Sequence, residues 1–197
     1  MKKIYFIIII VLSLVSFAFA QKSPIKWGKV SDEEMNMEYY SKDSSACAVI
    51  LCDYGVSLES GFTRHVRIKI LKEEGLEYAN VKIPYLSFYS FYIPIKIKAQ
   101  SYTKNDNQEI EISKLEKKEV YDEKIYNYQR IKSFSIPNVK IGSIIEYSYY
   151  VRAGYIQEWQ FQREIPIIIS DYSVSFHSYY NFLTDLQGIT IFDEYEN

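Results

Sequence analysis

The sequence predicts an all-β protein, an antiparallel β-sandwich or open barrel of short strands with a minor N-terminal helix. Several segments alternate apolar and polar side chains with the period of two that a half-buried strand requires. Turn-forming residues separate these segments at short intervals, and no long stretch has helical periodicity. The 197-residue chain also contains 20 Tyr and 11 Phe, and aromatic side chains favour strands over helices.

The first twenty residues have the layout of a secretory signal peptide. Two lysines precede an apolar run over residues 4–19, and Ala18 and Ala20 place small side chains at the cleavage positions. We expect residues 1–20 to be removed and the product to be periplasmic or secreted. An uncleaved anchor is the alternative, which the shortness of the run and its small-residue ending disfavour. No other apolar stretch is long enough to span a membrane, so no stable span is expected after cleavage.

Residues 21–43 form a polar segment that precedes the main domain. Ser31 is followed three residues later by Glu34, the spacing of a capping box, which predicts the start of a short helix. Residues 44–197 are then expected to form a single β-sandwich domain, because no Gly-, Ser- or Pro-rich linker and no internal repeat divides them.

Three strand segments are expected in the first half of this domain. Residues 46–52 are continuously apolar, as in a strand buried on both faces, and Asp53-Tyr54-Gly55 ends them. Residues 63–71 alternate, which predicts a half-buried strand with Arg67 and Lys69 facing solvent. Residues 95–113 alternate on both sides of Asn105-Asp106-Asn107 and are expected to form a hairpin.

The second half opens with charged residues 113–122, interpreted as a connection or a solvated strand face. Three strand candidates follow, at residues 129–136, 144–152 and 159–169, and residues 173–177 form a further strand candidate. Pro166 lies inside the third candidate, which indicates an edge position or a bend.

Composition and motifs exclude several classes of function. The formal net charge is −2, so the chain has no basic field to attract nucleic acid. It has no glycine-rich phosphate loop, no Gly-x-Ser-x-Gly elbow and no cluster of His, Cys, Asp or Glu at metal-ligand spacing. We therefore expect no cofactor and no metal site.

Cys47 and Cys52 are interpreted as two small buried side chains. In one strand they would point to opposite faces, roughly 16 Å apart at about 3.3 Å per residue, which is too far for a disulfide. A stand-alone hydrolase would need one of these thiols beside His65 or His177 with an orienting group, and no local signature for such a site is present.

Tyrosine clusters leave two interpretations open. Aromatic residues crowd residues 85–92 and 147–150, and Tyr179 and Tyr180 lie near the end. They could fill the core and cover strand faces, where aromatic side chains are preferred. Exposed rings could instead stack on sugar rings or contact a peptide, and only their exposure distinguishes the two cases.

The run from Phe134 to Tyr149, with its Pro-Asn-Val and Gly-Ser-Ile-Ile-Glu-Tyr sequences, resembles a bacterial domain of unknown function. That domain lies N-terminal to transglutaminase-like domains in exported proteins. Weaker matches extend the resemblance over roughly residues 26–180. It implies a β-sandwich accessory domain beside a papain-like cysteine catalytic domain, which would be its partner in the same or a separate chain.

The resemblance carries no catalytic role to this chain, because neither cysteine lies in a motif that matches that nucleophile. The chain reaches Asn197 without the Cys-His-Asp residues, which we interpret as a truncated product or fragment. We therefore expect a non-enzymatic exported domain. The alternative is an independent glycan- or peptide-binding module that uses surface tyrosines.

Glu146 is the carboxylate of most interest, because it lies inside an aromatic-rich strand. If buried it needs a basic partner, such as Arg130, Arg152 or Arg163, and a structural ion pair is the expected role. The candidate binding residues are Glu146, Tyr147, Tyr149 and Trp159.

Overall fold

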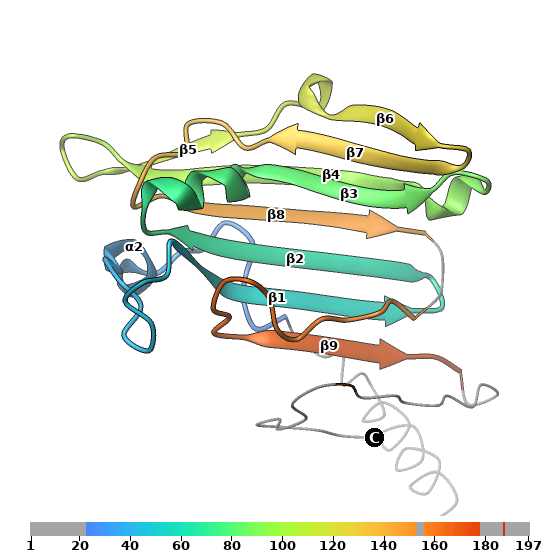
Figure 1. Ribbon diagram of the computed structural model, residues 1–197, viewed down its shortest axis with the longest axis horizontal. Coiled ribbons are helices and arrows are strands. Elements are labelled where there is room, and N and C mark those ends of the chain that lie inside the picture. The colour runs from blue at the N-terminus through green and yellow to red at the C-terminus, as the bar shows by residue number, and fades with distance from the viewer. Residues whose placement is uncertain (1–22, 153–155, 178–186, 188–197) are drawn as a thin grey trace, which may run out of the picture.

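The computed structural model describes residues 23–152, 156–177 and 187 of the chain. Within them the strands form two sheets that face each other (Figure 1). The larger sheet has the order β5 (Ile110–Lys114), β4 (Pro94–Lys104), β8 (Ile144–Val151), β2 (Gly61–Ile70), β1 (Ala48–Leu58) and β9 (Ser170–Ser175). The smaller sheet has the order β3 (Asn80–Leu86), β7 (Gln129–Ser135) and β6 (Tyr121–Tyr126). The predicted β-sandwich is confirmed.

Neighbouring strands pair antiparallel, with the exception of β1 and β9. These two run parallel, with Asp53 opposite Ser170 and Leu58 opposite Ser175. The helical elements are short: α2 (Asp32–Asn36) and three 3₁₀ turns, η1 (Glu73–Ala79), η2 (Ser90–Tyr92) and η3 (Lys117–Glu119). Among the described residues, no helix combines the length and the apolar character that crossing a membrane requires.

The main core fills the space between the two sheets. Alternate residues of β2 and β8 supply Val66, Ile68 and Ile145, and the smaller sheet supplies Val81 and Phe134. Each such side chain contributes roughly 1.5–3 kcal/mol when it is fully buried. The alternation seen in the sequence therefore identifies the residues that hold the sheets together.

A second, smaller core lies on the opposite face of the six-stranded sheet. There Met35 and Ala46 of the N-terminal segment pack with side chains of the sheet, among them Val49, Leu51 and Ile144. We use "N-terminal segment" for residues 23–47, which lead through α2 into β1. As Ser31 and Glu34 predict, α2 begins with a capping box in which each residue's side chain bonds the other's backbone N–H.

The N-terminal segment overturns one prediction. Strand β2 is not half-buried, since Arg67 and Lys69 are 2% and 1% exposed. Alternation normally places such residues in solvent, but here the N-terminal segment covers that face. The sequence pattern of β2 could not show that another part of the chain packs over it.

Other strand predictions are confirmed with changed bounds, and one is wrong. The hairpin over 95–113 forms as β4 and β5. Strand β1 is buried on both faces as expected but continues through Asp53-Tyr54-Gly55 to Leu58. Residues 159–169 form no strand, and β9 begins only at Ser170. Backbone contacts to β1 begin earlier, with the bridge of Ile167 to Ile50 and the hydrogen bond from the Asp53 N–H to the carbonyl of Ile169 at 2.8 Å. The short strands β3 and β6 were not predicted.

Candidate functional site

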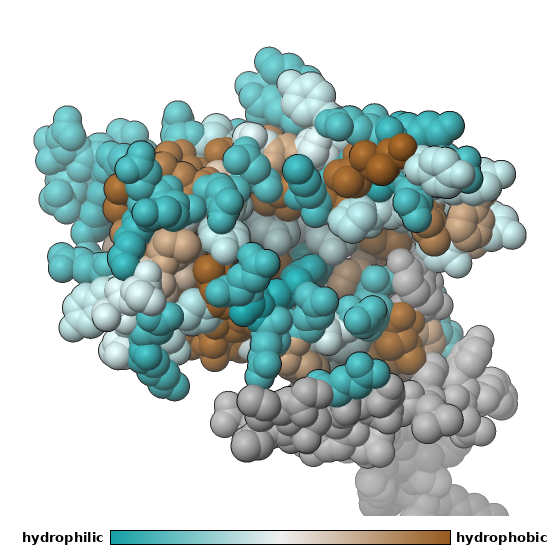
Figure 2. Space-filling view, viewed as in Figure 1, coloured by the Kyte–Doolittle hydropathy of each residue, from teal (hydrophilic) through white to brown (hydrophobic). Residues whose placement is uncertain are grey.

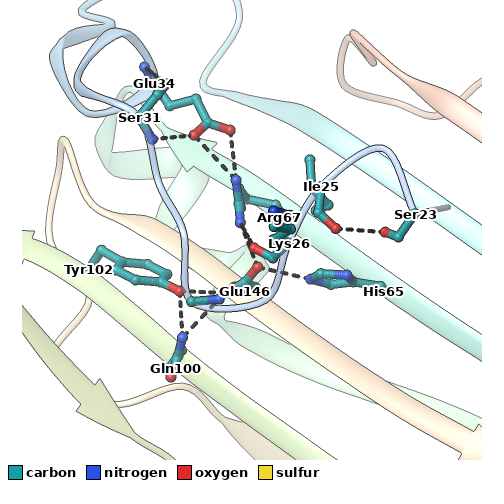
Figure 3. A network of polar contacts seen from close by, with 11 residues as sticks. Ser23, Ile25, Lys26, Ser31, Glu34, His65, Arg67, Gln100, Tyr102 and Glu146 are labelled. Carbon is teal, nitrogen blue, oxygen red and sulfur yellow. Dashed lines mark hydrogen bonds and ion pairs between the residues drawn. The ribbon is translucent and has the colours of Figure 1, made fainter.

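The carboxylate of Glu146 lies at the centre of a buried polar network on the face that the N-terminal segment covers (Figure 3). Glu146 is fully buried. It accepts hydrogen bonds from Arg67 Nη2 at 2.7 Å, His65 Nε2 at 2.8 Å, the backbone N–H of Gly28 at 3.0 Å, Gln100 Nε2 at 3.2 Å and the Tyr102 hydroxyl. A carboxylate offers about four lone-pair positions, so both oxygens are fully used.

Strand register brings these side chains together. Strand β8 lies between β2 and β4, and Glu146 is opposite Arg67 on one side and Gln100 on the other. His65 and Tyr102 stand two residues from these partners, so period-two alternation puts them on the same face. The network is therefore a consequence of three neighbouring strands in one register.

The protonation states in this network follow from its geometry. Burial alone would raise the pKa of Glu146, but the hydrogen bonds from His65 and Tyr102 and the ion pair with Arg67 lower that pKa to about 2. Glu146 is therefore ionised at neutral pH. Because a carboxylate can only accept, the Nε2 atom of His65 must carry a hydrogen. Burial, with the hydrogen bond to Glu146, raises the pKa of Tyr102, which keeps its hydroxyl protonated.

Arg67 and Lys69 extend the network to the N-terminal segment. Arg67 Nη1 pairs with Glu34 at 2.9 Å, and Arg67 Nη2 also donates to the carbonyl of Lys26 at 2.9 Å. Lys69 Nζ donates to the carbonyls of Met35 at 2.7 Å and Gly142 at 2.6 Å. Burial lowers the pKa of Lys69 to about 8. Arg67 and Lys69 therefore bind the N-terminal segment to the sheet.

A second buried acid, Asp53, lies on the face of the larger sheet that bears the main core. Arg64 binds it with two bonds, Nε to Oδ1 at 2.8 Å and Nη2 to Oδ2 at 2.6 Å, and Arg163 lies 3.5 Å away. Beside this cluster is a cavity of about 1090 Å³ whose lining includes Tyr147 and Trp159. The bidentate geometry is the strong form of an Arg–carboxylate pair.

Trp159 is held by contacts with Tyr172 and Arg64. One face stacks on Tyr172, with centroids 4.9 Å apart, and the guanidinium of Arg64 lies 5.1 Å from the ring centroid. The indole N–H donates to Ser170 at 3.1 Å. A Cβ added to Gly55 would lie 2.4 Å from the Trp159 ring, so glycine permits this close approach. The face that stacks on Tyr172 is therefore closed to a sugar.

The four predicted binding residues fall into two places. Glu146 belongs to the network under the N-terminal segment, on the face opposite the other three. Tyr147 and Trp159 both line the cavity beside Asp53. Tyr149 lies in the main core against Phe62, and burial raises the pKa of Tyr147 to about 12.

The predicted basic partners of Glu146 are wrong. Arg130 binds Asp122 at 2.8 Å, Arg163 is near Asp53, and Arg152 is exposed. The partner is Arg67, which the alternation of β2 had assigned to solvent. The sequence pattern also does not indicate that His65, Gln100, Tyr102 and Asp53 belong to buried clusters. The position of Arg67 in a strand was the one indication in the sequence, but it does not show that Arg67 pairs with Glu146.

Both cysteines are free, and they lie in different settings. Cys47 precedes β1 and is partly buried, whereas Cys52 is buried at a register irregularity of β1. Burial raises the pKa of Cys52 to about 12, so its thiol is protonated and unreactive at neutral pH. In the part of the chain that the structure describes, no three His, Cys, Asp or Glu residues are grouped as metal ligands would be.

Comparison with known proteins finds a family match by sequence and a similar fold among solved structures. The model of DUF3857, described as a domain of unknown function with a solved structure, matches residues 58–188. The fold is similar to a crystal structure described as a "putative protease" from Parabacteroides distasonis ATCC 8503, with a TM-score of 0.52 and 14% identity. The similarity covers 68% of this chain and 29% of that chain, so this chain corresponds to under a third of that protein. No curated protein matches.

Proposed function

The chain belongs to the DUF3857 family of domains of unknown function, and from this premise we propose that it is a non-catalytic accessory domain of an exported peptidase. In this proposal the domain packs against, or presents substrate to, a transglutaminase-like catalytic domain outside this chain. A periplasmic or secreted location is part of the proposal and rests on the predicted signal peptide.

The observation that carries the proposal is the shared fold with part of a longer chain. The sandwich corresponds to 29% of a protein described as a "putative protease", which leaves most of that protein for other domains. The resemblance in the sequence to a domain N-terminal to transglutaminase-like domains supports the same arrangement.

The geometry of the buried charges supports a structural role for this domain. Glu146 has all its lone pairs engaged by protein donors, and Asp53 is held by two arginines. A general base needs a free lone pair within reach of the proton that it removes. Cys52 is buried and protonated. These groups stabilise the sandwich and leave catalysis to the partner.

The alternative of a glycan- or peptide-binding module depends on exposed rings. The structure divides the aromatic residues: Tyr149 lies in the main core, whereas Phe88 and Tyr89 are exposed. Phe88 contacts Tyr89 and Tyr128 with interplanar angles of 60° and 75°. Tyr89 and Phe91 are parallel within 10° but stack on each other, so each covers one face of the other. Tilted and mutually stacked rings do not form an open flat platform for a sugar, so the accessory role is the better supported proposal.

The test begins with the reading frame beyond the codon for Asn197. The transglutaminase-like domain encoded there, or in a neighbouring exported protein, is produced with and without this domain, and hydrolysis of a labelled peptide is measured by kcat/KM. We expect loss of this domain to lower either kcat/KM or the stability of the catalytic domain. Unchanged activity and stability, or a genome that encodes no such domain, would overturn the accessory role.

The non-catalytic part is tested on this chain alone. We expect no hydrolysis of the same peptide by the wild-type chain and none by the Cys47→Ala/Cys52→Ala variant. Hydrolysis by the wild type that the double variant abolishes would establish a cysteine hydrolase and contradict the proposal.

A further inference from the structure

One end of the sandwich carries exposed aromatic side chains that neither core uses. They come from the β3–β4 connection and from the β6–β7 turn, which lie at the same end of the smaller sheet (Figure 1). Pale and brown side chains gather there at the right-hand end of the upper sheet in Figure 2. The aromatic end is defined by six side chains that are 40–67% exposed: Leu86, Phe88, Tyr89, Phe91, Tyr126 and Tyr128.

The rings of the aromatic end contact each other across the two connections. Phe88 meets Tyr128 at a centroid distance of 5.8 Å, and Tyr89 stacks on Phe91 at 5.0 Å. The Ser87 hydroxyl and backbone N–H both donate to the carbonyl of Tyr128, at 3.0 and 2.8 Å. The two connections therefore form one continuous surface.

The charge pattern around this surface is unusual for the chain. Residues 83–95 and 125–129 contain no charged side chain, although 24% of all residues are charged. Basic residues flank both stretches in the sequence, and Lys96 and Lys124 are exposed. The Lys96 ammonium lies 5.0 Å from the centroid of the Tyr150 ring, and Lys124 follows the exposed Glu123. The acidic side chain of the neighbouring β1–β2 turn, Glu59, accepts a hydrogen bond from the backbone of His177 at 2.6 Å.

This combination fits a bilayer surface better than a sugar or a peptide groove. Tyr favours the boundary between head groups and acyl chains, where its ring can insert while its hydroxyl stays hydrated. Phe inserts into the same boundary as a purely apolar side chain. Insertion makes no demand on the angle between rings, whereas stacking on a sugar does. Lysines beside the inserted rings complement anionic head groups, at about 1 kcal/mol for each cation near the surface.

We propose that the aromatic end docks on anionic phospholipid bilayers, with Phe88, Phe91 and Tyr128 entering the head-group region. Lys96 and Lys124 contact the phosphates. The accessory domain would then hold its catalytic partner close to a membrane. This inference does not depend on the identity of that partner.

The first test locates the surface that faces the lipid. Phe91→Trp and Tyr128→Trp each place a fluorophore at the aromatic end, and Tyr39→Trp and Tyr121→Trp place one at exposed positions elsewhere, 64% and 63% exposed in the wild type. Vesicles of phosphatidylcholine and phosphatidylglycerol carry bromine on their acyl chains, which quenches nearby tryptophan. We expect quenching beyond the wild-type background at residues 91 and 128 and none at residues 39 and 121.

The second test measures partition onto the same vesicles by sedimentation. The expected leader, residues 1–20, is apolar enough to bind vesicles, so every variant keeps the same N-terminus and only differences from the wild type count. Phe88→Ser/Phe91→Ser should lower partition at least about tenfold, the effect of removing two half-exposed rings from the contact. The matched control Tyr121→Ser should stay within about twofold of the wild type.

Substitution of Lys96 or Lys124 tests whether vesicle partition depends on the charge of the lipid. Lys96→Gln and Lys124→Gln should each lower partition about fivefold on vesicles with phosphatidylglycerol and leave it unchanged on pure phosphatidylcholine. Circular dichroism confirms that each variant is folded.

Two results would overturn the inference. The first is equal quenching at all four tryptophan positions, or none at residues 91 and 128. The second is unchanged vesicle partition of Phe88→Ser/Phe91→Ser. If this variant also no longer raises the kcat/KM or the stability of the catalytic partner, the aromatic end is a protein contact. The second result leaves the accessory role intact, whereas failure of the peptidase test leaves the vesicle result intact.

Discussion

At the level of single residues, the carboxylate of Glu146 determines how three strands and the N-terminal segment are joined. It is the counter-ion of Arg67 in a buried place that water does not reach, and it also accepts a hydrogen bond from the backbone N–H of Gly28. Removing one member of such a network is costly because the others stay buried without a partner. The network therefore has more effect on stability as a unit than any one bond in it.

We predict that Glu146→Gln lowers the free energy of unfolding by about 3 kcal/mol at pH 7, because Arg67 loses its buried counter-ion. Urea unfolding measures this loss. Glu123→Gln is the matched control, since Glu123 is exposed on β6, and it should change stability by less than about 0.5 kcal/mol. Equal effects of the two substitutions would show that the buried network adds no stability.

The same residue predicts a pH dependence of stability. The folded-state pKa of Glu146 is about 2, below its ordinary value of 4.5, so between these pH values the unfolded chain binds more protons. Above about pH 4.5 Glu146 makes its full contribution to the free energy of unfolding. As pH falls towards 2, about 3 kcal/mol of that contribution is lost. The difference between the wild type and Glu146→Gln should shrink by that amount over this range. A constant difference would contradict the depressed pKa.

Thiol reactivity distinguishes the two cysteines. Because burial raises the pKa of Cys52 to about 12, only about one thiol in ten thousand is ionised at pH 8. We predict that a thiol reagent modifies Cys52 of the native chain only on the timescale of unfolding. In Cys47→Ser, no fast reaction should remain. A fast-reacting thiol in that variant would mean that Cys52 is accessible, and would reopen the hydrolase interpretation.

At the level of elements, both the second core and polar contacts hold the N-terminal segment to the sheet. Its helix α2 has only five residues, too few to be stable by itself. Glu34 links this helix to the sheet, since its carboxylate accepts both from the backbone N–H of Ser31 at 2.7 Å and from Arg67 at 2.9 Å. The neighbouring residue Glu33 is exposed and has the same charge.

Glu34→Ala should therefore loosen the segment, and Glu33→Ala should not. Loss of charge-assisted hydrogen bonds worth roughly 1.5–3 kcal/mol raises the population of molecules in which the N-terminal segment is detached from the sheet. The rate of proteolysis is proportional to that population. We predict that trypsin cleaves after Lys26 and Lys29 at least about tenfold faster in Glu34→Ala than in the wild type. Similar cleavage rates in the two variants would show that Glu34 does not hold the segment.

At the level of the whole molecule, the two sheets share one core. Phe134 of the smaller sheet is 3% exposed and packs among residues of the larger one. We predict that Phe134→Ala lowers the free energy of unfolding by about 3–5 kcal/mol. Tryptophan fluorescence and far-UV circular dichroism should shift together, because neither sheet can bury its apolar face alone.

The matched control for this prediction is Ile125→Ala, on an exposed position of the same sheet. It should cost less than about 1 kcal/mol. Separate transitions for fluorescence and circular dichroism in Phe134→Ala would show that the sheets unfold independently.

The sequence by itself determined the β-rich class, the capping box at Ser31, the 95–113 hairpin and the apolar face of β2. These features are local: side-chain alternation, turn residues and caps act within a few residues. Strand β6 was missed because it is exposed along its whole length and shows no apolar alternation. Strand β3 does alternate, with Val81 and Ile83 buried, but Pro84 interrupts a pattern of only seven residues.

Only the tertiary structure decided which face of β2 is covered and which cation meets Glu146. Both depend on strand register and on packing of the N-terminal segment over the sheet, contacts between residues as far apart as Gly28 and Glu146. Packing between the two sheets likewise separates Tyr149, which is buried in the main core, from the exposed rings of the aromatic end, although both occur in similar Tyr-rich segments. The local sequence pattern determines which side chains of a strand share a face. Whether that face is buried depends on the element that packs over it, and this packing forms only when the chain folds.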